Sequence, residues 1–133
     1  MSLVVVDASV FTAFYISDDP RRDAVVSRLA VGDALFAPAH LDAEVVSALR
    51  GLAIKSAEVS QFVPSALAHL ADFPIRRMPL APLLGRMWEL RDNVTPYDAA
   101  YVALAERLDS PVMTCDVRMS KASGTRCRFD LIS

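Results

Sequence analysis

The sequence predicts a three-layer α/β/α fold built on a parallel sheet. One observation is the run Leu3–Val6, whose continuous apolarity is typical of a strand buried on both faces. Another is the alternation of further short apolar runs with longer segments of helical periodicity, which favours βα units. The third is the length of 133 residues, which suits a single domain spanning 1–133.

Five short strands are expected, each bounded by turn residues or by a helix start. They are Leu3–Val6, Ala34–Ala37, Pro74–Pro79, Pro111–Cys115 and Arg128–Leu131. The third lies between prolines, which donate no backbone hydrogen bond, so we expect it near an edge of the sheet. Because helices separate the strands, parallel pairing through right-handed crossovers follows.

The intervening segments show helical spacing of apolar residues. They are Val10–Ile16, Arg21–Ala30, Pro38–Ala53, Ser56–Leu70, Leu80–Leu90, Thr95–Leu108 and a turn or two within Val117–Ala122. In the third segment, Leu41, Val45 and Leu49 form part of an apolar stripe. Pro64 is expected to kink the fourth segment unless it falls in the first turn.

The composition excludes several classes of protein. Fourteen basic against 16 acidic residues give a net charge of −2, which argues against a binder that relies on phosphate neutralisation. At 53% apolar residues the chain is too hydrophobic for disorder. The N-terminal run lacks the basic region of a signal peptide, and no stretch approaches the roughly 20 apolar residues of a membrane span.

The two cysteines predict reduced thiols in the cytoplasm and no disulfide framework. A zinc site would need Cys115, Cys127, His40 and His69 together, and these lack paired ligand spacing.

Two aspartates follow predicted strands directly. Asp7 comes after the first strand and Asp116 after the fourth. Ligands of open parallel sheets bind outside the carboxyl ends of the strands, so both carboxylates are expected at one rim. The structural alternative is that each aspartate caps the helix that follows it.

Two further acids lie on predicted helices. Glu44 borders the apolar stripe of its helix, where it is either a site residue or a charge flanking the core. Asp98 lies three residues after Thr95, with Pro96 between them, which resembles a capping box. Helix capping alone would therefore account for Asp98.

Four acids together call for a common explanation. Carboxylates about 4 Å apart repel by about 4 kcal/mol per pair at an effective dielectric constant near 20. A cation that neutralises them makes such a cluster stable, and all-oxygen sites suit Mg²⁺ or Mn²⁺. Such ions can activate water and stabilise the leaving oxygen of a phosphodiester.

At these residues the sequence resembles the PIN-domain family, and most closely the ribonuclease toxins of VapBC toxin–antitoxin pairs. The motifs are Val5-Val6-Asp7-Ala8-Ser9, Ala43-Glu44-Val45, the stretch Thr95 to Ala105, and Thr114-Cys115-Asp116-Val117-Arg118. The resemblance covers essentially the whole chain in order and length.

The resemblance implies four or five parallel strands and an endoribonuclease that depends on Mg²⁺, or on Mn²⁺ in its place. It carries over Asp7, Glu44, Asp98 and Asp116 as catalytic metal ligands. Ser9 and Thr114 match small hydroxyl positions near the centre, although Ser9 would equally cap a helix and Thr114 would equally be a plain strand residue. Some family members carry an additional acid shortly after the fourth, where this chain has Arg118. A cognate antitoxin and a homodimer are the implied partners. The apolar helices Val59–Leu70 and Leu80–Leu90 offer surface for either contact, although burial in the core accounts for most of their apolar residues.

RNA as a substrate also needs cations that bind phosphate. The candidates are Arg50, Lys55, Arg91, Arg118 and Lys121, each of which is alternatively a solvated surface residue. Tyr97 is a candidate for base stacking or for packing, and Trp88 for the core or a partner surface. Two bound divalent ions would change the formal charge from −2 to +2, so we expect RNA binding to be local, salt-sensitive and metal-dependent.

Three alternatives fit the sequence less well. A haloacid dehalogenase phosphatase needs a second aspartate where Ser9 stands, and a response-regulator receiver needs an acid beside Asp7. A non-catalytic PIN-like module that binds RNA or protein is the alternative from another class. It gives no reason for four mutually repelling acids to be present.

Overall fold

The computed structural model describes residues 2–133, which form a five-stranded, all-parallel sheet of order β3-β2-β1-β4-β5. The strands are β1 (Leu3–Val6), β2 (Ala34–Pro38), β3 (Ile75–Met78), β4 (Val112–Thr114) and β5 (Phe129–Leu131). All five predicted strands are present, and β3 lies at an edge as its flanking prolines indicate.

The helices lie close to their predicted positions. They are α1 (Ala8–Tyr15), α2 (Arg22–Leu29), α3 (Leu41–Ala53), α4 (Ala57–Asp72), the 3₁₀ turn η1 (Ala81–Leu83), α5 (Leu84–Glu89), α6 (Pro96–Leu108) and α7 (Val117–Ser120). The predicted helix Leu80–Leu90 is divided into η1 and α5. Pro64 lies in the middle of α4, not in its first turn, and is exposed.

The start of α3 differs from the prediction. Pro38 is the last residue of β2 and pairs with Met78 of β3, so it belongs to the sheet and not to the helix. A proline at the end of a strand loses little, because its missing N–H falls where the ladder stops. The helix begins only at Leu41.

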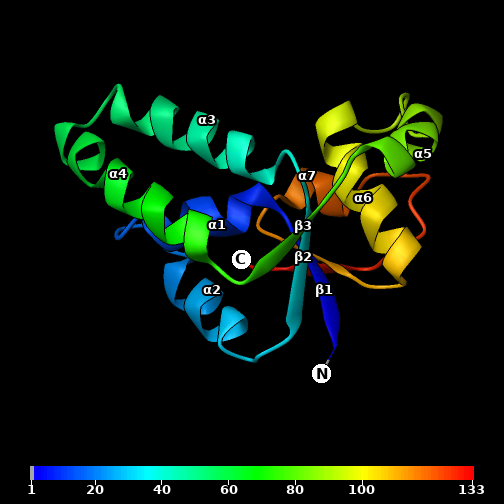
Figure 1. The fold of residues 1–133 in the computed structure, drawn as a ribbon, viewed down its shortest axis with the longest axis horizontal. Coiled ribbons are helices and arrows are strands. Elements are labelled where there is room, and N and C mark those ends of the chain that lie inside the picture. Colours follow the sequence, from blue (N-terminus) through cyan, green and yellow to red (C-terminus); the bar gives the residue numbers. More distant parts are fainter. Residues whose placement is uncertain (1) are drawn as a thin grey trace.

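Helices cover both faces of the sheet (Figure 1). α6 packs against β1, β2 and β4, while α1 contacts β4 on the other side and also contacts α2 and α3. α4 packs on α3, and α5 packs on α6. The predicted three-layer α/β/α architecture is confirmed. None of the helices in residues 2–133 has the length and apolar character needed to cross a membrane.

The central strands and α6 form the most completely buried part of the core. Val4, Val5 and Val6 are each at most 1% exposed, and the seven consecutive residues Ala99–Ala105 of α6 are all buried. A helical stretch that is apolar all round is typical of a buried position. The four alanines in this stretch of α6 allow the helix to approach the sheet closely. The N-terminus of α6 is therefore fixed beside the strand ends.

The strand order reverses at β1. From β1 the chain adds β2 and β3 on one side, and it then returns to place β4 and β5 on the other. In open α/β sheets a crevice forms at such a switch point, outside the carboxyl ends of the strands. This order also differs from the 2-1-3-4-5 order of response-regulator receivers, which removes that alternative.

Candidate active site

Asp7 and Asp116 lie at the switch point, directly after the adjacent strands β1 and β4. The backbone N–H of Asp7 donates to the carbonyl of Met113 at 2.9 Å, which continues the ladder between the strands. The structure thus brings both aspartates to the rim predicted from the sequence.

Asp7 is buried, with 5% of its surface exposed. It precedes α1, but its side chain makes no capping bond, so the capping alternative is wrong for this residue. Instead, its Oδ2 accepts hydrogen bonds from Ser9 Oγ at 2.6 Å and Thr114 Oγ1 at 2.8 Å. Burial raises the pKa of Asp7, and the charge of Glu44 adds to this, while the two hydroxyl bonds oppose it.

The two hydroxyls are themselves held by backbone N–H groups. Ser9 Oγ accepts from the N–H of Cys115 at 2.9 Å, and Thr114 Oγ1 accepts from the N–H of Asp116 at 2.9 Å. Each hydroxyl therefore accepts from the β4–α7 turn and donates to Asp7. Chains of this kind polarise one another and fix the groups at both ends.

Asp116 caps α7. Its Oδ1 accepts from the backbone N–H groups of Arg118 at 3.0 Å and Met119 at 3.2 Å. The capping alternative is correct for Asp116, but capping occupies only one of its two carboxylate oxygens.

Glu44 extends from α3 toward the start of α6. Its Oε1 accepts from the Tyr101 hydroxyl at 2.6 Å and lies 3.3 Å from His40 Nε2. Burial acts to raise the pKa of Glu44, but the bonds from His40 and Tyr101 outweigh it, so that pKa is lowered. Glu44 is therefore held by two side chains and acts electrostatically on Asp98 of the same group of acids.

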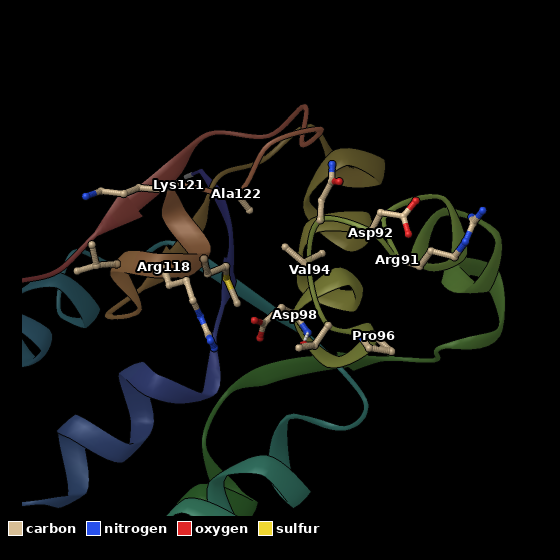
Figure 2. A pocket seen from close by; sticks show the side chains of 12 residues that line it. Arg91, Asp92, Val94, Pro96, Asp98, Arg118, Lys121 and Ala122 are labelled. Carbon is tan, nitrogen blue, oxygen red and sulfur yellow. Dashed lines mark hydrogen bonds between the residues drawn. The ribbon is translucent and has the colours of Figure 1, made fainter.

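Asp98 is the least constrained of the four acids. Thr95 Oγ1 accepts from the backbone N–H of Asp98 at 3.2 Å, which caps α6, and the carboxylate points into the groove beside Arg118 (Figure 2). Burial raises the pKa of Asp98 to about 6, helped by the negative charges of Asp7, Asp116 and Glu44 and opposed by Arg118. The four acids therefore share one electrostatic environment.

Lys and Arg do not neutralise this acidic quartet, which is Asp7, Glu44, Asp98 and Asp116. Within residues 2–133, none of the four carboxylates forms an ion pair with a lysine or arginine. In the same part of the chain, no three His, Cys, Asp or Glu side chains lie close enough together to enclose a metal ion. The four carboxylates therefore do not enclose an ion together, but their oxygens suit Mg²⁺, which binds through one or two carboxylates and retains several waters. The structure does not fit a zinc site made of Cys115, Cys127, His40 and His69. His69 bonds to Tyr15 at 2.8 Å, whereas His40 lies at Glu44.

A groove of about 880 Å³ opens beside Asp98, between the start of α6 and α7 (Figure 2). Three of the five predicted RNA-binding cations line it, namely Arg91, Arg118 and Lys121. Arg50 and Lys55 do not line this groove. They are exposed at the end of α3 and in the turn that leads to α4.

Two aromatic residues near this groove are exposed. Tyr97 at the start of α6 is 63% exposed and Trp88 on α5 is 68% exposed, so neither is a core residue. The Arg91 guanidinium lies 4.4 Å from the centre of the Trp88 ring. This contact orients a groove-lining cation.

Sequence reasoning missed two residues of the site, His40 and Tyr101. His40 lies four residues before Glu44, which is the spacing of neighbours on one helix face. Tyr101 lies three residues after Asp98 on the buried helix α6, so its hydroxyl needed a partner. Both features are visible in the sequence. Only the positions of α3 and α6 in the fold show that both side chains reach Glu44.

Comparison with known proteins identifies the family. A family model described as PIN domain matches residues 4–124. Ribonuclease VapC12 of Mycobacterium tuberculosis is 34% identical over 131 residues, which cover 98% of this chain and 100% of that protein. Ribonuclease VapC3 of the same species is 40% identical over 119 residues, covering 90% and 86%.

Solved structures share the fold at lower identity. Mycobacterium tuberculosis VapC20, described as a sarcin-ricin loop cleaving toxin, superposes with a TM-score of 0.71 at 17% identity over 92% of this chain and 96% of that one. VapBC2 from Rickettsia felis, bound to a DNA fragment from its promoter, gives 0.66 at 11% identity over 98% and 99%. These structures share the fold, and the family model and the sequence relatives show that the chain belongs to the PIN-domain family and, within it, to the VapC ribonucleases.

Proposed function

We propose that this protein is a metal-dependent endoribonuclease and the toxin of a type II toxin–antitoxin pair. The observation that carries the proposal is the acidic quartet at the switch point, held in place without any Lys or Arg ion pair within residues 2–133. Relatives named as ribonucleases, which align with nearly the whole chain, support the same activity.

Mg²⁺ is the proposed cofactor, and Mn²⁺ can replace it. Asp7, Glu44, Asp98 and Asp116 would hold it, one or two of them directly and the others through the waters that Mg²⁺ retains, with Ser9 and Thr114 supporting Asp7. When bound, a divalent ion activates water and stabilises charge on the leaving oxygen. The reaction is hydrolysis of an RNA phosphodiester that leaves a 5′-phosphate and a 3′-hydroxyl.

RNA is proposed to enter along the groove beside Asp98. Arg91, Arg118 and Lys121 line this groove and supply positive charge for the phosphates. Arg50 and Lys55 lie outside it and would contact only a longer substrate. The low net charge of the protein means that these few cations, and not a broad basic face, bind the RNA.

The proposed partners are a cognate antitoxin and a second copy of the chain. The relative from Rickettsia felis is a VapBC pair by its description, which supports the antitoxin. The family match ends at residue 124, while β5 at Phe129–Leu131 completes the sheet, so we propose that one domain spans 1–133.

Cleavage of RNA by single variants tests this function. Wild type, Asp7→Asn and Asp98→Asn are incubated with total RNA and Mg²⁺, and Asp72→Asn at the exposed end of α4 serves as the control. We expect both quartet variants to lose more than about 100-fold in rate, because even the groups that support a ligand are worth 10–100-fold. Cleavage at the wild-type rate by Asp7→Asn and Asp98→Asn would show that the quartet is not catalytic.

Two further measurements separate a toxin from a non-catalytic module. Mn²⁺ is expected to raise the Tm of the wild type by binding the native state, whereas a scaffold without a metal site shows no shift. Mapping the 5′ ends of cellular RNA after induction, with and without the protein from the adjacent reading frame, tests the antitoxin and identifies the cleaved sequence.

A further inference from the structure

The acids of the quartet are held in a common way. In three of them, one carboxylate oxygen has two polar partners within 3.3 Å, and it is Oδ2 of Asp7, Oε1 of Glu44 and Oδ1 of Asp116. Across residues 2–133, no hydrogen bond reaches the second oxygen of Glu44 or of Asp116. Holding one oxygen fixes the plane of a carboxylate and leaves the other available to a ligand.

Glu44 differs from the other two acids in what holds it. Asp116 is held by backbone N–H groups of its own turn, and Asp7 is held by the small hydroxyls of Ser9 in α1 and Thr114 in β4. Glu44 is bound by His40, just before α3, and by Tyr101, which belongs to α6. The position of Glu44 therefore depends on two side chains from different elements.

The Tyr101 hydroxyl has no packing role that phenylalanine would not fill. Tyr101 is fully buried in the core, and the hydrogen bond of its hydroxyl goes to Glu44 Oε1 at 2.6 Å. A buried hydroxyl without a partner costs free energy, so its presence in the core is explained by the carboxylate that it holds.

His40 shows the same orientation toward Glu44. Its Nε2 lies between two acceptors, Glu44 Oε1 at 3.3 Å and the Tyr97 carbonyl at 3.1 Å, so this nitrogen must carry the hydrogen. Its Nδ1 is buried and has no partner among the described residues. In this orientation of the ring, Nε2–H is directed at Glu44 and Tyr97, and the buried Nδ1 makes no hydrogen bond within the described residues.

We propose that Tyr101 and His40 are positioning residues, which hold Glu44 by Oε1 and leave Oε2 available to a divalent ion. This inference rests on the proposed function and adds two residues to the site. They do not contact the ion or the RNA. Their effect passes through Glu44.

Mn²⁺ binding by the full-length protein tests this assignment. The main variant is Tyr101→Phe, which removes one hydroxyl and keeps the buried ring. Tyr15→Phe is the matched control, because the Tyr15 hydroxyl also bonds to a histidine, His69 Nδ1 at 2.8 Å, at the contact of α1 with α4. Isothermal titration with Mn²⁺ gives the dissociation constant, and the Tm in EDTA shows that each variant is folded.

We expect Tyr101→Phe to weaken Mn²⁺ binding about 10-fold, within the 10–100-fold range for groups that orient metal ligands, and Tyr15→Phe to leave it unchanged. RNA cleavage by Tyr101→Phe should recover as Mn²⁺ is raised, which loss of packing alone would not produce. The pair His40→Leu and His40→Gln provides an independent arm: the leucine variant should weaken Mn²⁺ binding, and the glutamine variant, which retains a side-chain N–H, should weaken it less.

The outcomes separate this inference from the proposed function. If the wild type binds Mn²⁺ and the Tyr101→Phe and His40→Leu variants bind it equally well, the positioning role is wrong while the metal site stands. If the wild type binds no Mn²⁺, the proposed function itself fails. If Tyr101→Phe is unfolded in EDTA, the two His40 variants decide the question.

Discussion

Two groups of acidic residues at the sheet are held in opposite ways. Near the amino ends of β1 and β2, Arg28 pairs with Asp33 at 2.9 Å, and it also pairs with Asp130 within β5 at 2.5 Å. At the carboxyl ends, Asp7 and Asp116 are held by hydroxyl and backbone N–H groups. Hydrogen bonds at that end fix the position of a carboxylate and leave its negative charge in place.

This contrast distinguishes acids that stabilise the fold from acids that serve a site. An arginine neutralises its partner permanently and joins two elements, as Arg28 joins α2 to β5. A hydroxyl or an N–H orients a carboxylate that keeps its charge for a cation. The carboxyl end is therefore a place where the protein accepts repulsion among its own groups, as functional sites commonly do.

Among the changes that test this comparison, the largest effect is expected from Thr114→Val at the carboxyl end. Thr114 is fully buried, donates to Asp7 and accepts from the N–H of Asp116, so valine breaks both bonds while keeping the shape. We expect RNA cleavage to fall about 10–100-fold and the free energy of unfolding to fall by about 1–3 kcal/mol.

The control for this change is Thr12→Val, whose hydroxyl bonds only within α1, to the carbonyl of Ala8. It should leave cleavage unchanged. Equal cleavage by the Thr114→Val variant and the wild type would show that Asp7 does not need the hydroxyl.

A smaller effect, on stability alone, is expected from Arg28→Leu at the amino end. The change leaves Asp33 and Asp130 without their partner. The pairs are partly exposed, so we expect a loss of about 1–2 kcal/mol in the free energy of unfolding, between the values for exposed and buried pairs. Urea unfolding measures it, and kcat on RNA should stay at the wild-type value. A large loss of kcat would show that the two ends are not independent.

The next effect concerns how the Tm of the wild type and of Asp98→Asn depends on pH when both are measured in EDTA. The pKa of Asp98 is about 6 in the folded protein against 3.8 ordinarily, so between these values the native state holds more protons than the unfolded state. The free-energy cost of holding the charged Asp98 carboxylate in the native state is absent below about pH 4, and it grows as the pH rises through about 6. The Tm of Asp98→Asn minus that of wild type should therefore increase from pH 4 to pH 7, and a constant difference would contradict the raised pKa.

The smallest effect concerns the cations of the groove. In an Asp7→Asn background, Arg118→Gln should weaken RNA binding and reduce the slope of log K against log salt by about 0.7, the value for one contact with a single strand. Arg50→Gln at the end of α3 should leave the slope unchanged. Equal changes for both variants would place RNA along α3 as well as in the groove.

The fold was predictable where its signals are local. The valines of β1 and the Thr95-Pro96 start of α6 each specify their element through neighbouring residues, and both elements formed where predicted. The start of α3 was misjudged because Pro38 pairs with Met78, forty residues later in the chain. No local pattern contains that pairing.

The placement of Asp7 and Asp116 at one rim was predictable, but the surroundings of the acids were not. Strand ends placed Asp7 and Asp116, because the carboxyl ends of adjacent parallel strands meet at one rim. The bond from Tyr101 to Glu44 depends on how α6 faces α3, which only the packed structure shows. For the same reason, the sequence did not separate Arg118 in the groove from Arg50 outside it.

The pairing of β1 with β4 has a consequence for protein synthesis. Asp7 leaves the ribosome 107 residues before the Thr114 hydroxyl that holds it. A nascent chain can pair β1 with β2 and β3 first, but β4 and the turn that carries Asp116 are made only after α6. The four acids are therefore brought together only once α6 and β4 have been made, so a partly translated chain lacks the assembled quartet.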